Sequence, residues 1–231
     1  MRAVLSAGFM ALACGGLAVA QDDPNARTPS LYVVEQENVR AEFVVGNAAW
    51  GDILATLSSL RSDEASDNPN ITDELWARRN ENPPVFLFEV ARRFAATDPE
   101  RAVEAYFLGR ARSVYDASRC VDSTSVDVVD MASQFAGEAI TEILTTRLDL
   151  VEGVLQSMLD SGEVFTSTAS PWWACSFGQS AYYAAVNGAT LSGNEWLKVE
   201  AVWPSIQDTV RNNLRGNILL VRAAREQAAQ Q

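Results

Sequence analysis

The chain has 231 residues, 48% of them hydrophobic, and its 30 acidic residues outnumber its 18 basic ones to give a net charge of −12 at neutral pH. This negative balance argues against a nucleic acid or an anionic membrane as partner, because both attract basic proteins. The complete absence of histidine excludes Ser-His-Asp and Cys-His catalysis and every histidine-ligated metal centre. Only carboxylate-based, tyrosine-based or unusual Ser/Thr chemistry remains, and no motif for a cofactor or a metal is visible.

A secretory signal peptide is predicted over residues 1–20. Arg2 precedes an apolar run that ends at Ala18-Val19-Ala20, which places small residues at the two positions that signal peptidase reads. The run is barely long enough to span a bilayer and is diluted by glycine and alanine, so we favour cleavage after Ala20 over a membrane anchor. No later segment is apolar enough to span a membrane. We therefore expect a periplasmic or secreted protein with no integral membrane segment after cleavage.

Cysteine usage fits an oxidising destination. Cleavage would remove Cys14 and leave Cys120 and Cys175, an even pair that is most simply a disulfide in an exported protein. Two buried free thiols are the alternative, and a zinc site is disfavoured because no histidine is available to complete it. A lipoprotein with Cys14 as the lipidated residue is a weaker interpretation, since Ala11 stands where a large aliphatic residue is expected.

Residues 21–46 are predicted to form a polar leader followed by an extended segment. The leader, residues 21–30, contains two prolines and few apolar residues. Leu31–Val34 and Phe43–Val45 are short β-prone runs that form either a strand pair or two extended segments packed on helices. We favour the extended segments, because no tight hairpin turn joins the two runs.

Helical periodicity dominates from residue 47 onward. The clearest helix start is Asp98-Pro99-Glu100, which combines an N-cap, a proline at the first position and an acid in the first turn. The apolar spacing predicts helices over about 47–60, 72–79, 84–94, 99–118, 125–143, 148–161, 172–186 and from 203 onward. The short connections predict an all-α fold, a single-domain helical bundle or short helical array of about seven helices over residues 47–231, with room for a short extended N-terminal segment.

The stretch from Phe86 to Arg112, FLFEVARRFAATDPERAVEAYFLGRAR, resembles one unit of a Sel1-like or tetratricopeptide repeat. It has a helix, a short turn and then the pattern D-P-E-x-A-V-x-x-Y, with aromatic and small residues where paired helices interlock. The resemblance implies a helical pair that buries its face against a neighbouring unit and a concave surface that binds partners. One unit is visible, and Phe107 stands where the repeat has alanine. An ordinary helical hairpin with a good N-cap is the alternative interpretation, which we favour.

Four arginines fall on neighbouring helices of this acidic chain: Arg92, Arg93, Arg110 and Arg112. They are candidates for binding an anion or a carboxylate, because a guanidinium binds such groups with two parallel hydrogen bonds. Pairing within the chain is the alternative that we favour, since several acids lie nearby in sequence, namely Glu89, Glu100, Glu104 and Asp116.

A disulfide between Cys120 and Cys175 would bring two aromatic segments together. The candidate binding residues at this junction are Tyr115, Asp116, Arg119, Trp172 and Trp173. Trp, Tyr and Arg are favoured in protein-binding hot spots, and aromatic walls are common in ligand pockets. A covalently tied core in which these rings are simply buried is the alternative that we favour.

These features together predict a non-enzymatic, exported helical protein that binds another protein. Removal of Arg2 with the signal would leave 17 basic residues against 30 acidic ones, a net charge of −13, which steers the protein toward a basic partner. An inhibitor or immunity-type protein against a basic envelope-acting factor is one concrete version. The alternatives are a carboxylate-dependent hydrolase that acts on an envelope polymer and a small-molecule carrier that uses the aromatic junction.

Overall fold

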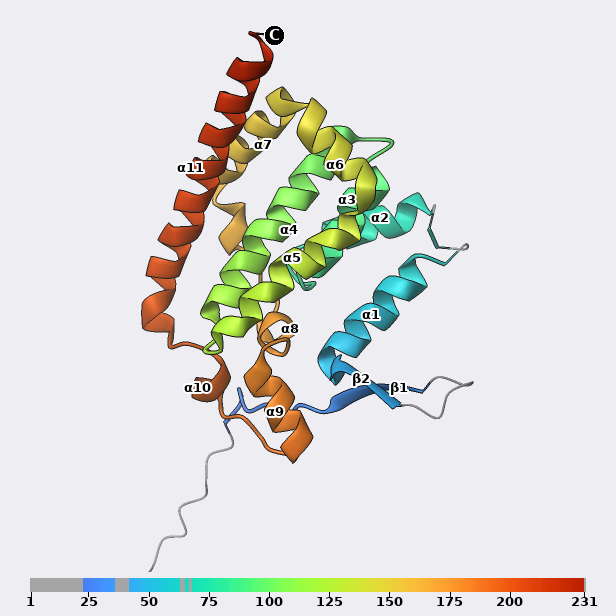
Figure 1. Cartoon of the computed structure of the whole chain (residues 1–231), viewed down its shortest axis with the longest axis vertical. Helices are drawn as coiled ribbons and strands as arrows, with labels where there is room; N and C mark the ends of the chain where they lie inside the picture. Colours follow the sequence, from blue (N-terminus) through green and yellow to red (C-terminus); the bar gives the residue numbers. More distant parts are fainter. Residues whose placement is uncertain (1–22, 36–41, 63–64, 67, 231) are drawn as a thin grey trace, which may run out of the picture.

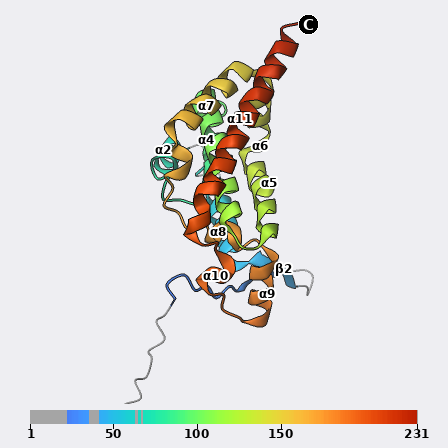
Figure 2. The same ribbon diagram turned by 90° about the vertical axis from the view of Figure 1, so that its left-hand side faces the viewer.

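The computed structural model describes residues 23–35, 42–62, 65–66 and 68–230. The predicted signal peptide, residues 1–20, lies outside the described residues. As the sequence predicts, the fold is all-α apart from one small hairpin, and its helices pack into one body (Figures 1 and 2). The strands are β1 (Leu31–Glu35) and β2 (Glu42–Asn47), and the α-helices are α1 (Ala48–Leu60), α2 (Pro69–Ala77), α3 (Val85–Phe94), α4 (Pro99–Arg119), α5 (Val128–Ser133), α6 (Gly137–Thr146), α7 (Leu148–Ser161), α8 (Trp172–Cys175), α9 (Gln179–Asn187), α10 (Gly193–Trp196) and α11 (Trp203–Ala228).

The long helix α4 lies at the centre of the body. Asp98 caps it by accepting a hydrogen bond from the backbone N–H of Arg101 at 3.1 Å, and Pro99 occupies its first turn. Helix α3 packs beside α4, so residues 86–112 form a helical hairpin, and α7 and α11 pack along α4 as well (Figure 1). Gly109 permits the close approach of α3, since a Cβ atom there would lie 3.0 Å from the Cβ of Leu87.

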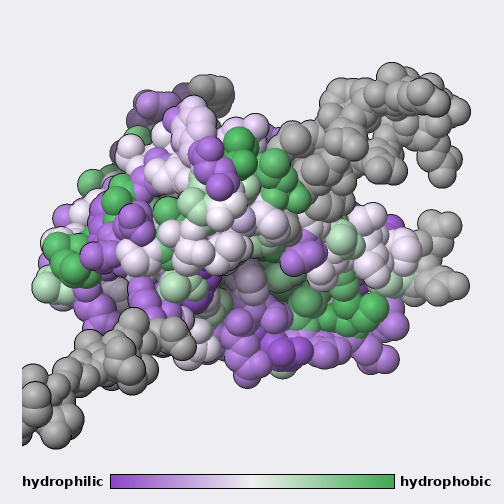
Figure 3. All heavy atoms as spheres, turned by 90° about the horizontal axis from the view of Figure 1, so that it is seen from below, coloured by the Kyte–Doolittle hydropathy of each residue, from purple (hydrophilic) through white to green (hydrophobic). Residues whose placement is uncertain are grey.

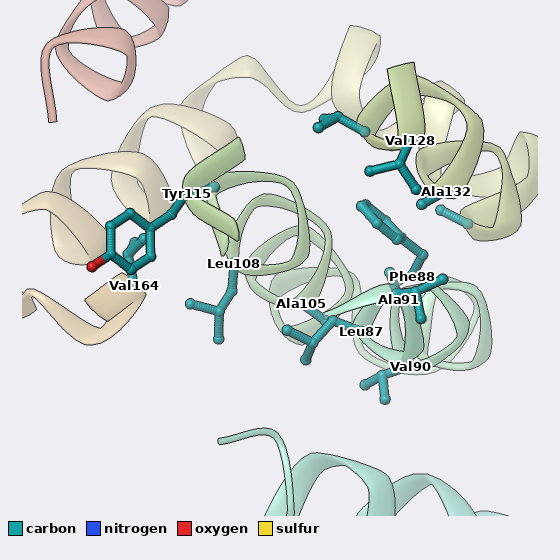
Figure 4. Packing of buried hydrophobic residues seen from close by; sticks show 14 of the residues in the cluster. Leu87, Phe88, Val90, Ala91, Ala105, Leu108, Tyr115, Val128, Ala132 and Val164 are labelled. Carbon is teal, nitrogen blue, oxygen red and sulfur yellow. The ribbon is translucent and has the colours of Figure 1, made fainter. Parts of the chain in front are cut away.

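The hydrophobic core forms where α3, α4 and α5 meet (Figure 4). Phe88 of α3, Leu108 of α4 and Val128 of α5 are each at most 1% exposed. Removing such side chains from water contributes about 1.5–3 kcal/mol apiece. Packing on several sides therefore fixes the position of α4, which carries most of the candidate residues described below.

The N-terminal β-prone runs form a strand pair rather than the extended segments that the sequence analysis favoured. Strands β1 and β2 pair antiparallel from Leu31 opposite Asn47 to Glu35 opposite Glu42, with one register shift between Tyr32 and Val33. The two strands are joined by residues 36–41, a connection longer than the tight turns that mark a hairpin in sequence. Two strands can therefore pair without a tight-turn motif between them, which is why the prediction of extended segments was wrong.

Glycine interrupts the helix that was predicted as continuous over residues 125–143. Gly137, the first residue of α6, has φ +74°, a value that does not occur inside a continuous α-helix. The segment instead forms a 3₁₀ turn (Ser123–Asp127), α5, a second 3₁₀ turn (Gln134–Ala136) and α6. Gly162, which was expected to end α7, does adopt the left-handed conformation, with φ +68°.

A distant side chain interrupts the helix predicted over residues 172–186. Asp122 accepts a hydrogen bond from the backbone N–H of Ser180 at 2.6 Å and thereby starts α9 as a separate helix. A Cβ atom at Gly178, the residue directly before α9, would lie 2.7 Å from that carboxylate. The two breaks and the short α10, which no predicted range covers, turn the eight predicted ranges into eleven α-helical segments within the described residues.

The lower face of the molecule is built from the hairpin, α9, α10 and the first described residues (Figures 1 and 3). Asp23 accepts a hydrogen bond from the backbone N–H of Gly193 at 2.6 Å, and the indole N–H of Trp196 donates to the carbonyl oxygen of Asn25 at 2.7 Å. Arg27 lies over the Trp196 ring. The segment that follows the predicted signal is thus attached to α10, and Figure 3 shows apolar groups scattered among polar ones on this face.

Candidate functional site

Cys120 and Cys175 form a disulfide, as the sequence predicts, with their Cα atoms 5.3 Å apart. Cys120 follows the last residue of α4 and Cys175 ends α8, and both are buried. The bond therefore fixes α8 against the end of the central helix. Leu197, directly after α10, pairs with the backbone of Cys120, which adds α10 to the same junction.

Three of the five predicted junction residues, Tyr115, Arg119 and Trp173, cluster around the buried carboxylate of a fourth, Asp116. Asp116 is 1% exposed, and its two oxygens accept hydrogen bonds from Arg119 and from the indole N–H of Trp173, the latter at 2.7 Å. The Arg119 guanidinium lies over the rings of Tyr115 and Trp203, at 4.3 and 4.9 Å from their centroids. Burial raises the pKa of Asp116 above its ordinary value, although the charge of Arg119 opposes the rise.

The junction rings fill space rather than frame a cavity. Trp172, the fifth predicted residue, packs edge-on against Trp196 with ring centroids 5.1 Å apart. Tyr115 and Trp173 are 7% and 4% exposed. None of these rings lines any of the four cavities described below. The structure thus brings the predicted residues together but buries most of them.

Arg92 and Arg93 bind one buried acid of their own helix. Glu89, whose side chain is 0% exposed, accepts two hydrogen bonds from Arg92 at 2.6 and 3.0 Å and one from Arg93 at 2.9 Å. Arg61, just beyond α1, donates a fourth at 2.8 Å and also reaches the carbonyl oxygen of Phe135. Burial by itself would raise the pKa of Glu89, but the hydrogen bonds and charges of Arg92 and Arg61 outweigh it and lower that pKa. Arg61 and Glu89 therefore join α1, α3 and the turn before α6.

Arg110 and Arg112, the other two predicted arginines, point to different environments. Arg110 lies at the surface, and its guanidinium donates a hydrogen bond to the Asp130 carboxylate of α5 at 3.0 Å. Arg112 is 1% exposed and donates to the carbonyl oxygens of Arg79 and Glu163, which ties two loops to α4. Burial lowers the pKa of Arg112 to about 10. The four arginines are therefore not gathered into one anion site.

Four cavities open on the surface of the described residues. A shallow one of about 550 Å³ lies between the C-terminal part of α11 and α7, and one of about 370 Å³ lies between α4 and α11. A third, of about 330 Å³, lies between α4 and α7, and a fourth, of about 280 Å³, lies between α1 and α2. The last three volumes lie near or below the small end of the usual range for ligand pockets.

The cavity between α4 and α7, here called the α4–α7 groove, has acids at its rim and apolar residues at its floor (α4 and α7 are seen together in Figure 2). Its lining residues are Glu100, Glu104 and Leu108 of α4, Asp149, Leu150, Gly153, Val154, Ser157, Met158 and Ser161 of α7, and Glu163. Burial raises the pKa of Glu104, and the charges of Glu163 and Glu100 raise it further. No group of Cys, Asp or Glu in the described ranges is arranged to hold a metal ion.

From the sequence, Glu100 and Glu104 were predicted only as possible partners for arginine, and the rest of the groove was not predicted. Part of the groove can nevertheless be read from spacing: Glu100, Glu104 and Leu108 are four residues apart, which places them on one face of a helix. Gly153 and Ser157 follow the same spacing. Which face of α4 meets which face of α7 depends on how the helices pack, and no local pattern contains that information.

Comparison with protein-family models, with curated proteins and with solved structures finds no match. The resemblance of residues 86–112 to a helical-repeat unit therefore stays a prediction. Among the described residues, no helix combines the length and the apolar character needed to cross a bilayer.

Proposed function

We propose that this chain is an exported, non-enzymatic helical protein that binds a basic protein, as an inhibitor or immunity-type protein for an envelope-acting factor would. The observation that carries the proposal is the distribution of charge. Most described arginines, including several at the surface, are paired with acids of the chain itself, whereas many exposed acids among the described residues have no cationic partner. Such a surface attracts a cationic protein and repels nucleic acid and anionic lipid.

Two acids alone bind five of the arginines. Glu89 binds three of them, and Glu152 of α7 binds both Arg222 and Arg225 of α11. Arg112 donates to carbonyl oxygens instead of to a carboxylate. As a result, ten exposed acids have no ion-pair partner within the described part of the chain, namely Asp23, Asp52, Glu100, Asp127, Glu138, Glu142, Asp160, Glu195, Glu200 and Glu226.

The disulfide supports the exported location, because bonds of this kind persist in the periplasm and outside the cell and are rare in the cytosol. A protein held by a disulfide and by buried ion pairs also presents a rigid surface, which reduces the entropy lost on binding.

Affinity capture from an envelope extract tests the proposed function. The mature protein, immobilised through a C-terminal tag, should retain a basic protein whose association rate falls steeply as salt rises from 50 to 500 mM, since steering by exposed charge is screened over a Debye length of about 10 Å at 0.1 M salt. A single purified partner with an acidic isoelectric point, or a partner whose association is insensitive to salt, would contradict the proposal.

A carboxylate-dependent hydrolase is the second candidate, and one observation favours it. Glu104 has a raised pKa and lies in the α4–α7 groove with Glu163, and such a pair is what acid–base hydrolysis uses. Glu163, however, is bound by Arg79 at 2.7 Å. The test is incubation of the protein with peptidoglycan and with neutral envelope polysaccharides. Hydrolysis predicts new reducing ends with the native chain and none with Glu104→Gln.

A further inference from the structure

Gly153 lies in the middle of α7 and lines the α4–α7 groove, and no contact within the described residues requires a glycine there. A Cβ atom at Gly153 would have no neighbouring atom within 4 Å. Gly109 shows the opposite case, because a Cβ atom at that position would press on Leu87 at 3.0 Å. Since glycine destabilises the middle of a helix relative to alanine, Gly153 lowers the stability of α7 without relieving any close contact among the described residues.

The floor and the rim of the groove differ in chemistry. Leu108, Val154 and Met158 provide an apolar floor, and each is at most 8% exposed. Glu100 and Glu104 stand at the rim, and neither has an ion-pair partner or a side-chain hydrogen bond among the described residues. The groove is therefore apolar inside and negatively charged at its edge.

A long cationic side chain matches both parts of this groove. Arginine and lysine bury their aliphatic stems on apolar surface while their charged ends remain at a polar edge. A neutral apolar group would cover the floor but leave the glutamates desolvated and unpaired, and an anion would be repelled. The charge of the groove thus selects among possible occupants.

We propose that the α4–α7 groove receives an arginine or lysine side chain from a basic protein partner, with the stem on Leu108 and Met158 and the charged end between Glu100 and Glu104. This inference rests on the proposed function and names the part of the acidic surface that recognises the partner. Gly153 is the residue that determines whether the side chain fits.

Titration with N-acetyl-arginine-N-methylamide, followed by ¹H–¹⁵N NMR, tests the groove without the partner. The amide signals of Gly153 and Glu104 should shift together as the probe saturates, and the pKa of Glu104 should fall because a cation now lies beside it. Gly153→Ala should weaken probe binding at least 5-fold, since its methyl group enters the groove, while raising Tm by about 2–4 °C through better helix propensity. Glu104→Gln should weaken binding about 10-fold.

Gly216→Ala is the matched control. Gly216 lies in the middle of α11 and lines the cavity between α4 and α11, and a Cβ atom there would also have no neighbour within 4 Å. This variant should gain the same few degrees in Tm and bind the probe as the native chain does. Unchanged probe affinity in Gly153→Ala, or shifts spread evenly over all exposed acids, would overturn the inference.

The two proposals fail in different ways. If the native chain, Gly153→Ala and Glu104→Gln all capture a basic partner equally well, the proposed function stands but the groove takes no part in it. Conversely, if the groove binds the arginine probe but the protein captures no basic partner, the proposed function is contradicted and the groove remains a site for a cationic group.

Discussion

Glu89 and Asp116 are both buried carboxylates on the two helices of the central hairpin, yet their pKa values move in opposite directions. Glu89 accepts four hydrogen bonds from three arginines, and its pKa is lowered. Asp116 accepts one from Arg119 and one from Trp173, and its pKa is raised because burial outweighs them. Burial raises the pKa of both acids, and the direction of the net shift differs because Glu89 has more charged donors than Asp116.

The two regions also differ in what holds the neighbouring elements. Around Glu89, an ion pair with Arg61 and a hydrogen bond from Arg93 to the Leu60 carbonyl oxygen connect α1 to α3, and Arg93 also reaches the carbonyl oxygens of Ala65 and Asn68. Around Asp116, the disulfide connects α4 to α8, and the Cys120 sulfur lies 3.4 Å from the Asp116 carbonyl oxygen. The acid with fewer ion pairs is thus found where a covalent bond is present.

Glu89→Gln should have the largest effect on stability. It removes the carboxylate charge that binds three arginines, one of which, Arg93, is 3% exposed in its side chain. Breaking a buried charge pair on one side costs about 3–5 kcal/mol, and we expect the upper end of that range here because three ion pairs are broken at once. Urea unfolding followed by circular dichroism measures the loss. Glu81→Gln, at a carboxylate that is 64% exposed and paired with Arg78, is the control and should change stability by about 0.5 kcal/mol or less.

Reduction of the disulfide should come next. The bond joins residues 55 positions apart, and the chain-entropy model then gives about 4 kcal/mol of stabilisation. Unfolding in urea with and without a phosphine reductant measures it, and the Cys120→Ala/Cys175→Ala variant should reproduce the reduced value. Because the Glu89 cluster shares no partner with the disulfide, the two losses should add. A strong coupling between them would show that the two regions are not independent.

Much of this contrast was visible in the sequence. The disulfide follows from counting cysteines after the predicted cleavage, and the pairing of Arg92 and Arg93 with Glu89 follows from helical spacing of three and four residues. The start of α4 was predicted from Asp98-Pro99-Glu100, a local motif that needs no partner. These features depend on residues close in sequence or on chemistry that permits one pairing.

The features that sequence did not reveal depend on contacts between distant residues. The start of α9 is fixed by Asp122, which lies 58 positions before Ser180. The third arginine on Glu89, Arg61, lies 28 positions away, and the α4–α7 groove depends on which faces of two helices meet. Periodicity shows that each helix has two faces, but packing decides what those faces contact.

Asp116→Asn should have a moderate effect at neutral pH. The amide oxygen still accepts from the Trp173 indole, but Arg119 loses its counter-charge, and its Nε is already buried without a hydrogen-bond partner. We expect a loss of about 2 kcal/mol, within the range for leaving a buried polar group unsatisfied. Trp173→Phe, which removes the other donor, should cost a similar amount. If Asp116→Asn instead stabilised the protein at neutral pH, the Arg119 pair would contribute less than the burial of its charge removes.

The smallest expected effect is the pH dependence of stability, and its sign distinguishes the two acids. The folded-state pKa of Glu89 lies below the unfolded value of 4.5, so its stabilisation is present above pH 4.5 and is lost as the pH falls through the folded pKa. For Asp116 the folded pKa lies above the unfolded value of 3.8, so the native state binds the proton more tightly and loses stability as the pH rises from 3.8 through the folded pKa. The deficit of Glu89→Gln relative to the native chain should therefore grow between pH 3 and pH 7, whereas the deficit of Asp116→Asn should shrink over the same range. Urea unfolding of the three proteins at matched ionic strength tests both slopes, and two slopes of the same sign would show that the number of charged donors does not distinguish these acids.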